Sequence, residues 1–316
     1  MNAARPVIAL TSPIHPEWQA RLAEMAEVRV ATDASADALR AVVRDAHGLI
    51  VRNHLPQDIF DHAPHLRAVV RHGVGLDMIP VEQATARGIA VANLPGSNTT
   101  AVVEYCLGAM LHLRRGLATM DGALRTDGWK PARAQADSGT ELRGTTCGIV
   151  GVGTIGAQLA AVTQALGMRT LGLTRRPASL PAGVQAADKA TLMRESDVIV
   201  LCCPLTDETR GMIDAQALAQ VKPTAILINV ARGPVVDTGA LLDALERGTL
   251  GGAALDVHDV QPLPADAPIR QSPRVLLTPH VAGSTATSLY RMSEGAVQDV
   301  LRMLRGEPAS HPVNTV

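Results

Sequence analysis

The sequence predicts an α/β protein of two domains, each built on a parallel sheet that is covered by helices. The chain has 316 residues, which is long for a single core and suits two domains. Short apolar runs alternate with segments of helical apolar spacing, in one series before residue 95 and another after Cys147. Alternation of this kind is typical of parallel strands joined by crossover helices.

The first series contains four candidate strands, at Val7–Leu10, Val28–Ala31, Gly48–Val51 and Ala68–Arg71. Between them, Glu17–Met25 and Ala36–Asp45 have the apolar spacing of helices. A long apolar helix is then predicted from Thr99 to Ala118, with Asn98 or Thr99 as its cap.

The second series contains six candidate strands, most of them continuous apolar runs, as strands covered on both faces should be. These strands are Cys147–Val150, Arg169–Thr174, Val198–Cys202, Ala225–Val230, Ala253–Val257 and Val275–Thr278. A last helix, Ser288 to Arg305, is followed by Gly306 and Pro308. It is long enough to return and pack on the first domain.

Composition excludes several classes of partner. The net charge is −1, from 29 basic and 30 acidic residues, which favours neither nucleic acid nor an anionic membrane. The N-terminal apolar run is too short for a signal peptide, and no stretch approaches the roughly 18 apolar residues of a membrane span. The four cysteines lack metal-type spacing, so we expect free thiols, no metal and a cytoplasmic protein.

The segment Cys147–Gly156 carries a dinucleotide-binding motif, G-x-G-x-x-G, between a strand and a helical pattern that runs to Leu166. Gly151 permits the tight turn, Gly153 lets the backbone approach a pyrophosphate, and Gly156 lets the helix pack on the strand. The motif therefore predicts a Rossmann-type site.

The helix that begins at Thr154 and Ile155 offers free N–H groups and a positive dipole end to the pyrophosphate. An NAD site has an acidic residue about 20 residues further on. Here the next strand ends in Thr174, Arg175 and Arg176, which can bind a 2′-phosphate. We therefore predict that NADP(H) is preferred over NAD(H).

Several segments along nearly the whole chain resemble the D-isomer-specific 2-hydroxyacid dehydrogenases, including the glyoxylate/hydroxypyruvate reductases. The matching segments are His72–Asp77, Gly88–Asn93, Asn98–Glu104, Gly148–Gly156, Pro204–Thr206, Asn229–Gly233, Leu255–Val257 and Thr278–His280. The chain is similar to the short form of this family, which has no regulatory domain.

The resemblance implies a Rossmann-type doubly wound parallel sheet inserted into a smaller, flavodoxin-like α/β substrate domain. The substrate domain would comprise residues 1–97 and 286–316, and the dinucleotide domain 98–285. A homodimer through the cofactor domain is also implied. Further cofactor contacts implied by the family are Cys203, Pro204, Thr209, Val230, Ala231, Asp256, His280 and Gly283, with Asp256 facing the nicotinamide carboxamide.

Two residues follow predicted strands, at the carboxyl ends where open α/β sheets bind ligands: Arg232 and His280. The guanidinium fork of Arg232 suits the adjacent carboxylate and carbonyl oxygens of a 2-oxo acid. Reduction of a ketone requires a proton, which a histidine can give near neutral pH. By resemblance, Arg232 clamps and polarises the substrate, and His280 is the acid.

The third catalytic position departs from the family pattern, because Gln261 stands where a Glu normally holds and charges the histidine. The amide can accept a hydrogen bond but gives less support to a raised histidine pKa. Three interpretations follow: a reductase with a less basic histidine, a chemistry that needs less acid catalysis, or a weakened enzyme. The formate dehydrogenases of the superfamily resemble this chain in having Gln at this position. Asp259, two residues earlier, is an alternative source of a carboxylate beside the histidine.

The first domain is expected to hold the rest of the substrate. The backbone N–H groups of Gly73, Val74 and Gly75 are candidates for binding its carboxylate, as in the family. Polar residues after two strands are candidates for reading its far end, especially a second anionic group. They are Arg52, Asn53, Arg71 and His72, with Asn98 as a further substrate contact.

A second class of function is a dinucleotide-binding sensor or co-regulator that has kept the fold and lost turnover. Gln261 favours that alternative, whereas the presence of both Arg232 and His280 favours an enzyme. Fold alone does not discriminate between them.

Overall fold

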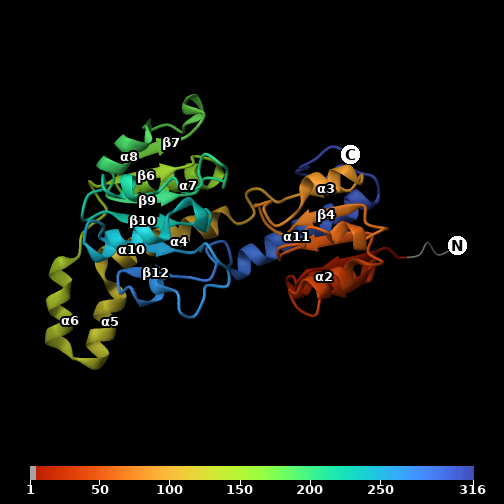
Figure 1. The fold of residues 1–316 in the computed structure, drawn as a ribbon, viewed down its shortest axis with the longest axis horizontal. Helices are drawn as coiled ribbons and strands as arrows, with labels where there is room; N and C mark the ends of the chain where they lie inside the picture. The colour runs from red at the N-terminus through yellow and green to blue at the C-terminus, as the bar shows by residue number, and fades with distance from the viewer. Residues whose placement is uncertain (1–4) are drawn as a thin grey trace. The chain divides into compact units, whose positions relative to one another are not determined.

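The computed structural model describes residues 5–316 and divides the chain into two compact units (Figure 1). One unit comprises the chain up to Asn98 together with Ser284–Val316, and the other is Thr99–Gly283. We call them the terminal unit and the central unit. Among the described residues, every helix is too short or too polar to cross a bilayer.

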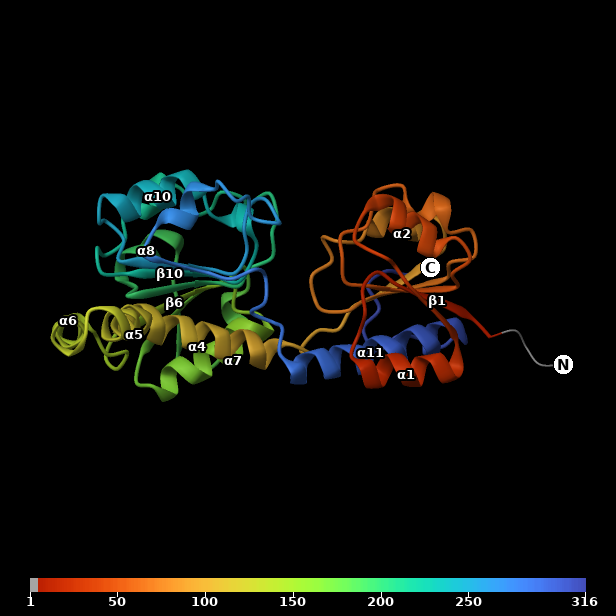
Figure 2. The same cartoon turned by 90° about the horizontal axis from the view of Figure 1, so that it is seen from below.

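The terminal unit is a parallel five-stranded sheet of order β2-β1-β3-β4-β5. The strands are β1 (Val7–Leu10), β2 (Glu27–Val30), β3 (Gly48–Val51), β4 (Ala68–Arg71) and β5 (Ala90–Ala92). The helices are α1 (Pro16–Met25), α2 (Ala36–Val43), α3 (Val81–Ala86) and α11 (Ala286–Leu304). Helices α1 and α11 cover one face of the sheet and α2 the other (Figure 2). This strand order is that of flavodoxin-like sheets, which confirms the predicted fold.

The central unit is a parallel seven-stranded sheet of order β12-β11-β10-β9-β6-β7-β8. Its strands are β6 (Thr146–Val150), β7 (Arg169–Leu173), β8 (Val184–Ala186), β9 (Val198–Leu201), β10 (Ile226–Asn229), β11 (Gly252–Leu255) and β12 (Val275–Leu277). Its helices are α4 (Thr99–Arg115), α5 (Leu117–Thr126), α6 (Trp129–Gln135), α7 (Thr154–Ala165), α8 (Lys189–Glu195), α9 (Ala215–Leu218) and α10 (Thr238–Glu246). The predicted doubly wound sheet is confirmed.

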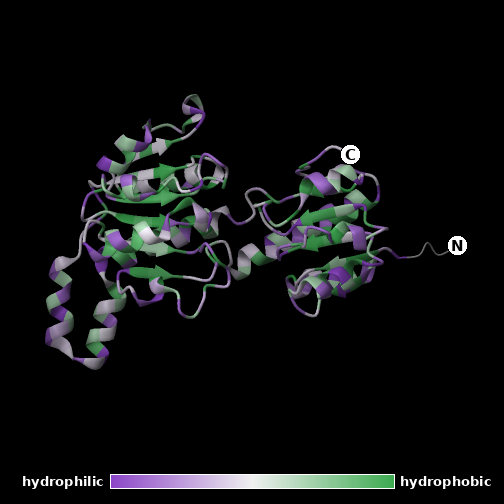
Figure 3. Ribbon diagram, viewed as in Figure 1, coloured by the Kyte–Doolittle hydropathy of each residue, from purple (hydrophilic) through white to green (hydrophobic). Residues whose placement is uncertain are grey.

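The strands of both sheets are the most hydrophobic parts of the chain (Figure 3). In the central unit, β6, β9, β10 and β11 are buried at every position. Helices α4 and α7 cover one face of that sheet, and α8 and α10 cover the other (Figure 2). Burial on both faces explains why these strands are continuous apolar runs in the sequence.

The long helix predicted from Thr99 to Ala118 is shorter than expected, because α4 ends at Arg115. Gly116 takes a left-handed conformation with φ of 60°, which an L side chain adopts only at a cost and which ends the helix. The chain then forms a hairpin of α5 and α6, which extends from the central unit (Figure 1). We call this hairpin the arm.

Candidate active site

The dinucleotide motif lies at the point of the central sheet where the strand order reverses. The chain runs from β6 outward to β7 and β8, then returns to β9 on the other side of β6. Ligands of such sheets bind in the crevice between the carboxyl ends of those two strands. Gly151 follows β6 with φ of 92°, and a Cβ there would lie 2.7 Å from the Cα of Cys203 after β9.

The backbone of this crevice fits a dinucleotide pyrophosphate. Helix α7 begins at Thr154, directly after Gly153, so its first N–H groups face outward at the crevice. A Cβ added to Gly153 would meet nothing within 4 Å, which leaves its backbone open to close approach. A Cβ on Gly156 would lie 2.4 Å from the Gly151 carbonyl oxygen, so only glycine permits this helix packing.

A groove of about 370 Å³ continues from this crevice, past the end of β7. Thr174, Arg175 and Arg176 line it, as do Cys203, Pro204 and Thr209 from the segment after β9. The Thr174 hydroxyl accepts a hydrogen bond from the Arg176 backbone N–H at 3.3 Å. The groove therefore brings together Thr174, Arg175 and Arg176, predicted from a strand end, with three residues that the family resemblance implied.

Sequence reasoning missed four other polar or flexible side chains in this groove: Ser179, Thr206, Glu208 and Met212. Ser179 follows the arginine pair within a 3-10 turn, so a polar residue shortly after Arg175 and Arg176 was the available signal. Glu208 belongs to the irregular segment after β9, and no hydrophobic pattern in the sequence indicates that its side chain lies in the groove.

His280 lies three residues after β12, in a backbone conformation with φ of 58°. Among the described residues, every other residue with a positive φ is a glycine. Such strain costs on the order of 1–3 kcal/mol and persists where surrounding contacts impose it. Here the His280 N–H donates to the Asp256 carbonyl at 2.7 Å.

The contact of Asp256 with a carboxamide stays a prediction, and the surroundings of its side chain show a structural role. Its side chain is 1% exposed, and its carboxylate accepts hydrogen bonds from the Thr278 hydroxyl and from the N–H groups of Val281 and Ala282 at 2.7–2.8 Å. These three donors fill most of the acceptor positions of the carboxylate. Asp256 therefore holds the turn that carries His280.

Gln261 is brought to His280, as its place in the sequence predicted. The His280 Nδ1–H donates to the Gln261 Oε1 at 3.0 Å. The Gln261 Nε2 donates to the His258 carbonyl at 3.3 Å, which fixes which end of the amide faces the imidazole. Nδ1 therefore carries a proton that Gln261 accepts.

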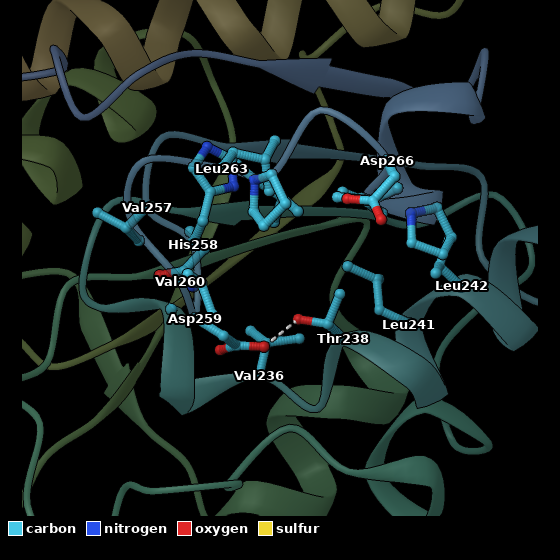
Figure 4. Close-up of a pocket in the computed structure, with 17 residues that line it drawn as sticks. Val236, Thr238, Leu241, Leu242, Val257, His258, Asp259, Val260, Leu263 and Asp266 are labelled. Atoms are coloured by element: carbon cyan, nitrogen blue, oxygen red, sulfur yellow. Dashed lines mark hydrogen bonds between the residues drawn. The ribbon is translucent and has the colours of Figure 1, made fainter.

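The alternative in which Asp259 supplies a carboxylate to His280 is corrected. Asp259 accepts a hydrogen bond from the Thr238 hydroxyl of α10 at 2.6 Å. Figure 4 shows this bond at the edge of a second cavity, of about 310 Å³, which His258, Asp259 and apolar side chains from α10 line. The Asp259 carboxylate is thus directed to α10, and Gln261 occupies the place beside the imidazole.

Arg232 lies three residues after β10, and β10 and β12 flank β11 in a parallel sheet. The residues after these strands therefore lie along one edge of the central sheet. The Arg232 Nη1 donates to the Ala231 carbonyl at 2.6 Å, and the Asn229 side chain donates to the Arg232 carbonyl at 2.9 Å. The side chain and the backbone carbonyl of Arg232 thus both take part in hydrogen bonds within the turn after β10. Val230 and the buried Ala231 belong to the same turn, and Gly283 ends the central unit.

In the terminal unit, the loop Gly73–Gly75 follows β4 with its three carbonyl groups bonded. The Gly73 carbonyl accepts from Leu94 N–H at 2.9 Å, that of Val74 from the Asn93 amide at 2.8 Å, and that of Gly75 from Arg71 Nε at 3.1 Å. Within residues 5–316, the N–H groups of Val74 and Gly75 have no hydrogen-bond acceptor. Two adjacent N–H groups of this kind suit a carboxylate.

His72 is the clearest correction among the predicted substrate residues. Its side chain is 3% exposed, and its Nε2 lies 2.9 Å from the Ser293 hydroxyl on α11. Burial, together with the positive charges of Arg52 and Arg71, lowers the pKa of His72 to about 3. A neutral imidazole enclosed in this way serves the packing of α11 on the sheet rather than a substrate.

Arg71 is likewise directed to the protein, since its guanidinium also donates to the carbonyl groups of Val51 and His72. Arg52 donates to the Pro13 carbonyl, and burial lowers its pKa. Asn53 accepts a hydrogen bond from the Ser12 hydroxyl. Arg52 and Asn53 follow β3, beside the end of β1, which is where the strand order of this sheet reverses.

Asn98 was predicted as a helix cap or a substrate contact. Its Oδ1 is buried, and it accepts no hydrogen bond within the described part of the chain. A buried amide oxygen without a donor is rare in folded proteins. It is consistent with a contact to a group outside residues 5–316 of this chain.

Comparisons with known proteins show the family to which this chain belongs. The family model described as the D-isomer specific 2-hydroxyacid dehydrogenase, NAD binding domain, matches residues 107–282. A glyoxylate reductase of Thermofilum pendens is 35% identical over 98% of this chain and 95% of its own length. The D-3-phosphoglycerate dehydrogenase of Mycobacterium tuberculosis is 36% identical over 98% of this chain, which spans 59% of that longer protein.

A solved structure supports the same family. The NADPH-dependent glyoxylate/hydroxypyruvate reductase of Sinorhizobium meliloti, crystallised with NADP and malonate, has a TM-score of 0.87 and 32% identity. The alignment covers 98% of this chain and 97% of that one. Fold and site thus define a nicotinamide-dependent oxidoreductase. The chain belongs to the D-isomer-specific 2-hydroxyacid dehydrogenase family, and it transfers hydride between a nicotinamide dinucleotide and a 2-oxo acid.

Proposed function

We propose that this enzyme reduces a small 2-oxo acid, such as glyoxylate or hydroxypyruvate, with NADPH as the preferred cofactor. The observation that carries the proposal is the bond between Gln261 and the Nδ1 of His280, so that the imidazolium form of His280 would give its proton from Nε2. The reduced nicotinamide supplies the hydride to the carbonyl carbon. His280 gives a proton to the carbonyl oxygen, so the product is the 2-hydroxy acid.

Arg232 would bind the carboxylate and the carbonyl oxygen of the substrate with its guanidinium fork. The positive charge of the guanidinium, placed beside the carbonyl oxygen, stabilises the negative charge that develops on that oxygen during hydride transfer. The free N–H groups of Val74 and Gly75, and the Asn98 side chain, are further candidates for the substrate carboxylate and hydroxyl.

Arg52 and Asn53 remain candidates for the far end of the substrate. A half-buried guanidinium that is directed to a backbone carbonyl favours an anion nearby. A substrate with a second anionic group is therefore worth including among the acids tested.

The experiment that tests this function is a panel of 2-oxo acids assayed with NADPH and with NADH. We expect NADPH oxidation with glyoxylate or hydroxypyruvate at micromolar enzyme or below. A protein that binds NADPH tightly but oxidises it with none of the acids would instead be a dinucleotide sensor.

The NADP preference is supported by the end of β7, where Arg175 and Arg176 line the groove and no acidic residue lies between Gly151 and Asp188. A hydrogen bond to a charged group contributes about 1.5–3 kcal/mol. We expect Arg175→Gln combined with Arg176→Gln to lower kcat/KM for NADPH at least tenfold and to leave kcat/KM for NADH nearly unchanged.

A matched control is Arg194→Gln, which removes an arginine of α8 in the same unit and should leave both cofactors unaffected. Steady-state kinetics with each cofactor provide the measurement. Equal losses for NADPH and NADH in the double variant would contradict the assignment to a 2′-phosphate.

Gln261 sets the charge beside His280, which makes Gln261→Glu a sharp test. Reduction needs the protonated imidazole, so the rate falls as pH rises through the histidine pKa. A carboxylate at this position stabilises the imidazolium, and we expect the fall to move to higher pH by about 1–3 units. The pH profile of kcat/KM checks this, with Asp259→Asn as a control that leaves the profile in place.

We further propose a homodimer formed through the arm. Large apolar side chains are exposed there and on α4: Leu111, Leu117, Leu124 and Trp129, the last being 74% exposed. Exposed apolar clusters on helices favour burial against a second copy.

The free thiols of Cys106, Cys147, Cys202 and Cys203 favour a reducing compartment, which supports a cytoplasmic location.

The arm is tested by Leu124→Glu combined with Trp129→Glu. We expect this variant to elute as a monomer in size-exclusion chromatography with light scattering, because charges would be buried in the interface. Met25→Glu changes an exposed apolar residue of α1 and should leave the dimer intact. A dimer that survives both arm substitutions would place the interface elsewhere.

A further inference from the structure

A second histidine, His258, touches each of the segments that carry the catalytic groups of the central unit. It lies in the loop after β11, three residues before Gln261. Its ring Nε2 lies 3.0 Å from the Thr278 carbonyl, two residues before His280. A carbonyl oxygen can only accept, so this nitrogen carries the proton and donates.

The backbone of His258 makes the other two contacts. Its carbonyl accepts the hydrogen bond from Gln261 Nε2, which sets the orientation of the amide that faces His280. A Cβ on Gly233, next to Arg232, would lie 2.1 Å from the carbonyl carbon of His258. The His258 backbone is therefore packed directly against the turn after β10.

These contacts have a common consequence for the part of the loop that carries Gln261. Asp256 joins the start of the loop to the segment around His280. Beyond Asp256, two side-chain hydrogen bonds join the loop to that segment: the ring of His258 to Thr278, and Gln261 to His280. If the first bond is lost, the loop is held less firmly at Thr278. The Gln261 amide is then free to move away from the imidazole or to turn over.

Resting on the proposed reduction, we propose that His258 is a positioning residue for proton transfer. Its Nε2–H bond to Thr278 holds the loop so that Gln261 keeps the His280 proton on Nδ1. In the imidazolium form of His280 the second proton is on Nε2, and that proton is the one given to the substrate oxygen. His258 itself contacts no reacting group in this role.

Substitutions at this position should leave the fold intact, because His258 is half-buried and lines the cavity of about 310 Å³ (Figure 4). Phenylalanine keeps an aromatic ring but has no N–H group. Glutamine has an N–H donor at a similar distance from the backbone. Asp266→Asn, in the same loop and cavity, is a control that should behave as the wild type.

The first measurement needs no substrate. Long-range ¹H–¹⁵N spectra of the histidine rings in the wild-type protein should show a proton on Nε2 of His258 and on Nδ1 of His280. In His258→Phe, the His280 ring should become a mixture of both tautomers. A Nδ1-protonated His258 in the wild type, or an unchanged His280 ring in the variant, would overturn the proposal.

The second measurement is kinetic. Misplacement by about 1 Å can cost 100-fold in rate, so we expect His258→Phe to lower kcat at least tenfold with the KM for NADPH within twofold. The isotope effect with deuterated NADPH should rise, and His258→Gln should recover most of kcat. A wild-type kcat in His258→Phe, or no recovery in His258→Gln, contradicts the positioning role.

The two measurements separate this inference from the proposed function. If the wild-type protein reduces no 2-oxo acid, the proposed reaction fails, while the ring spectra still decide how His258 and His280 are protonated. If it reduces them and His258→Phe does so equally well, the inference fails and the reaction stands.

Discussion

Replacement of His280 by asparagine is expected to lower kcat for reduction of a 2-oxo acid by about 10²- to 10⁴-fold, the usual contribution of general acid catalysis. The turn that carries His280 is held by Asp256 through the N–H groups of Val281 and Ala282, so the backbone should survive the change. The affinity for NADPH should stay within about twofold of wild type, since the glycine motif is untouched.

Pre-steady-state oxidation of NADPH and direct titration of the cofactor separate these two effects. His62→Gln is a suitable control, because His62 is an exposed histidine of the terminal unit that lies beside Asp58. A variant at position 280 with near-wild-type kcat would mean that the proton comes from another donor, such as water.

Replacement of Arg232 should have a comparable effect on a different kinetic constant. Arg232→Met removes a bidentate contact to the substrate and the charge at its carbonyl oxygen, and loss of one such stabilising group costs about 10²- to 10³-fold. We expect kcat/KM for the 2-oxo acid to fall by at least that factor, with a marked rise in KM.

Arg232→Lys is the informative partner of this variant. Lysine keeps the positive charge but lacks the planar fork, so it should recover only part of the loss. Full recovery would show that charge alone matters and that the fork does not bind the carboxylate. Arg210→Lys changes an arginine in the segment after β9 and serves as a control.

Much of the fold could be predicted from local pattern. Strands β1, β3 and β4 have the predicted bounds, and the other predicted strands differ from their predicted bounds by one or two residues. Their apolar runs are long enough to be recognised, and both faces are covered. Strands β5 and β8 were missed, since each has three residues and part of β8 is exposed. Runs that short have no resolvable period.

The arm was also missed, and the reason is physical. Helices α5 and α6 bury one side chain each, Ala123 and Ala132, so no apolar stripe marks them in the sequence. The break between α4 and α5 depends on one left-handed glycine, which a sequence of helix-forming residues does not reveal.

The sequence by itself determined the two parallel sheets, the glycine motif and the placement of Arg232 and His280 after strands. Strand periodicity and a short motif are local properties, so a single chain displays them. Only the tertiary structure decided that His72 is buried against Ser293, 221 residues away.

The tertiary structure likewise decided the partners of three carboxylate or amide groups near His280. Asp256 holds its turn, Asp259 binds Thr238 and Gln261 meets the imidazole. All three lie within six residues of one another, and their side chains point to different elements. Which partner each side chain reaches depends on how distant segments pack, and spacing along the chain does not encode that.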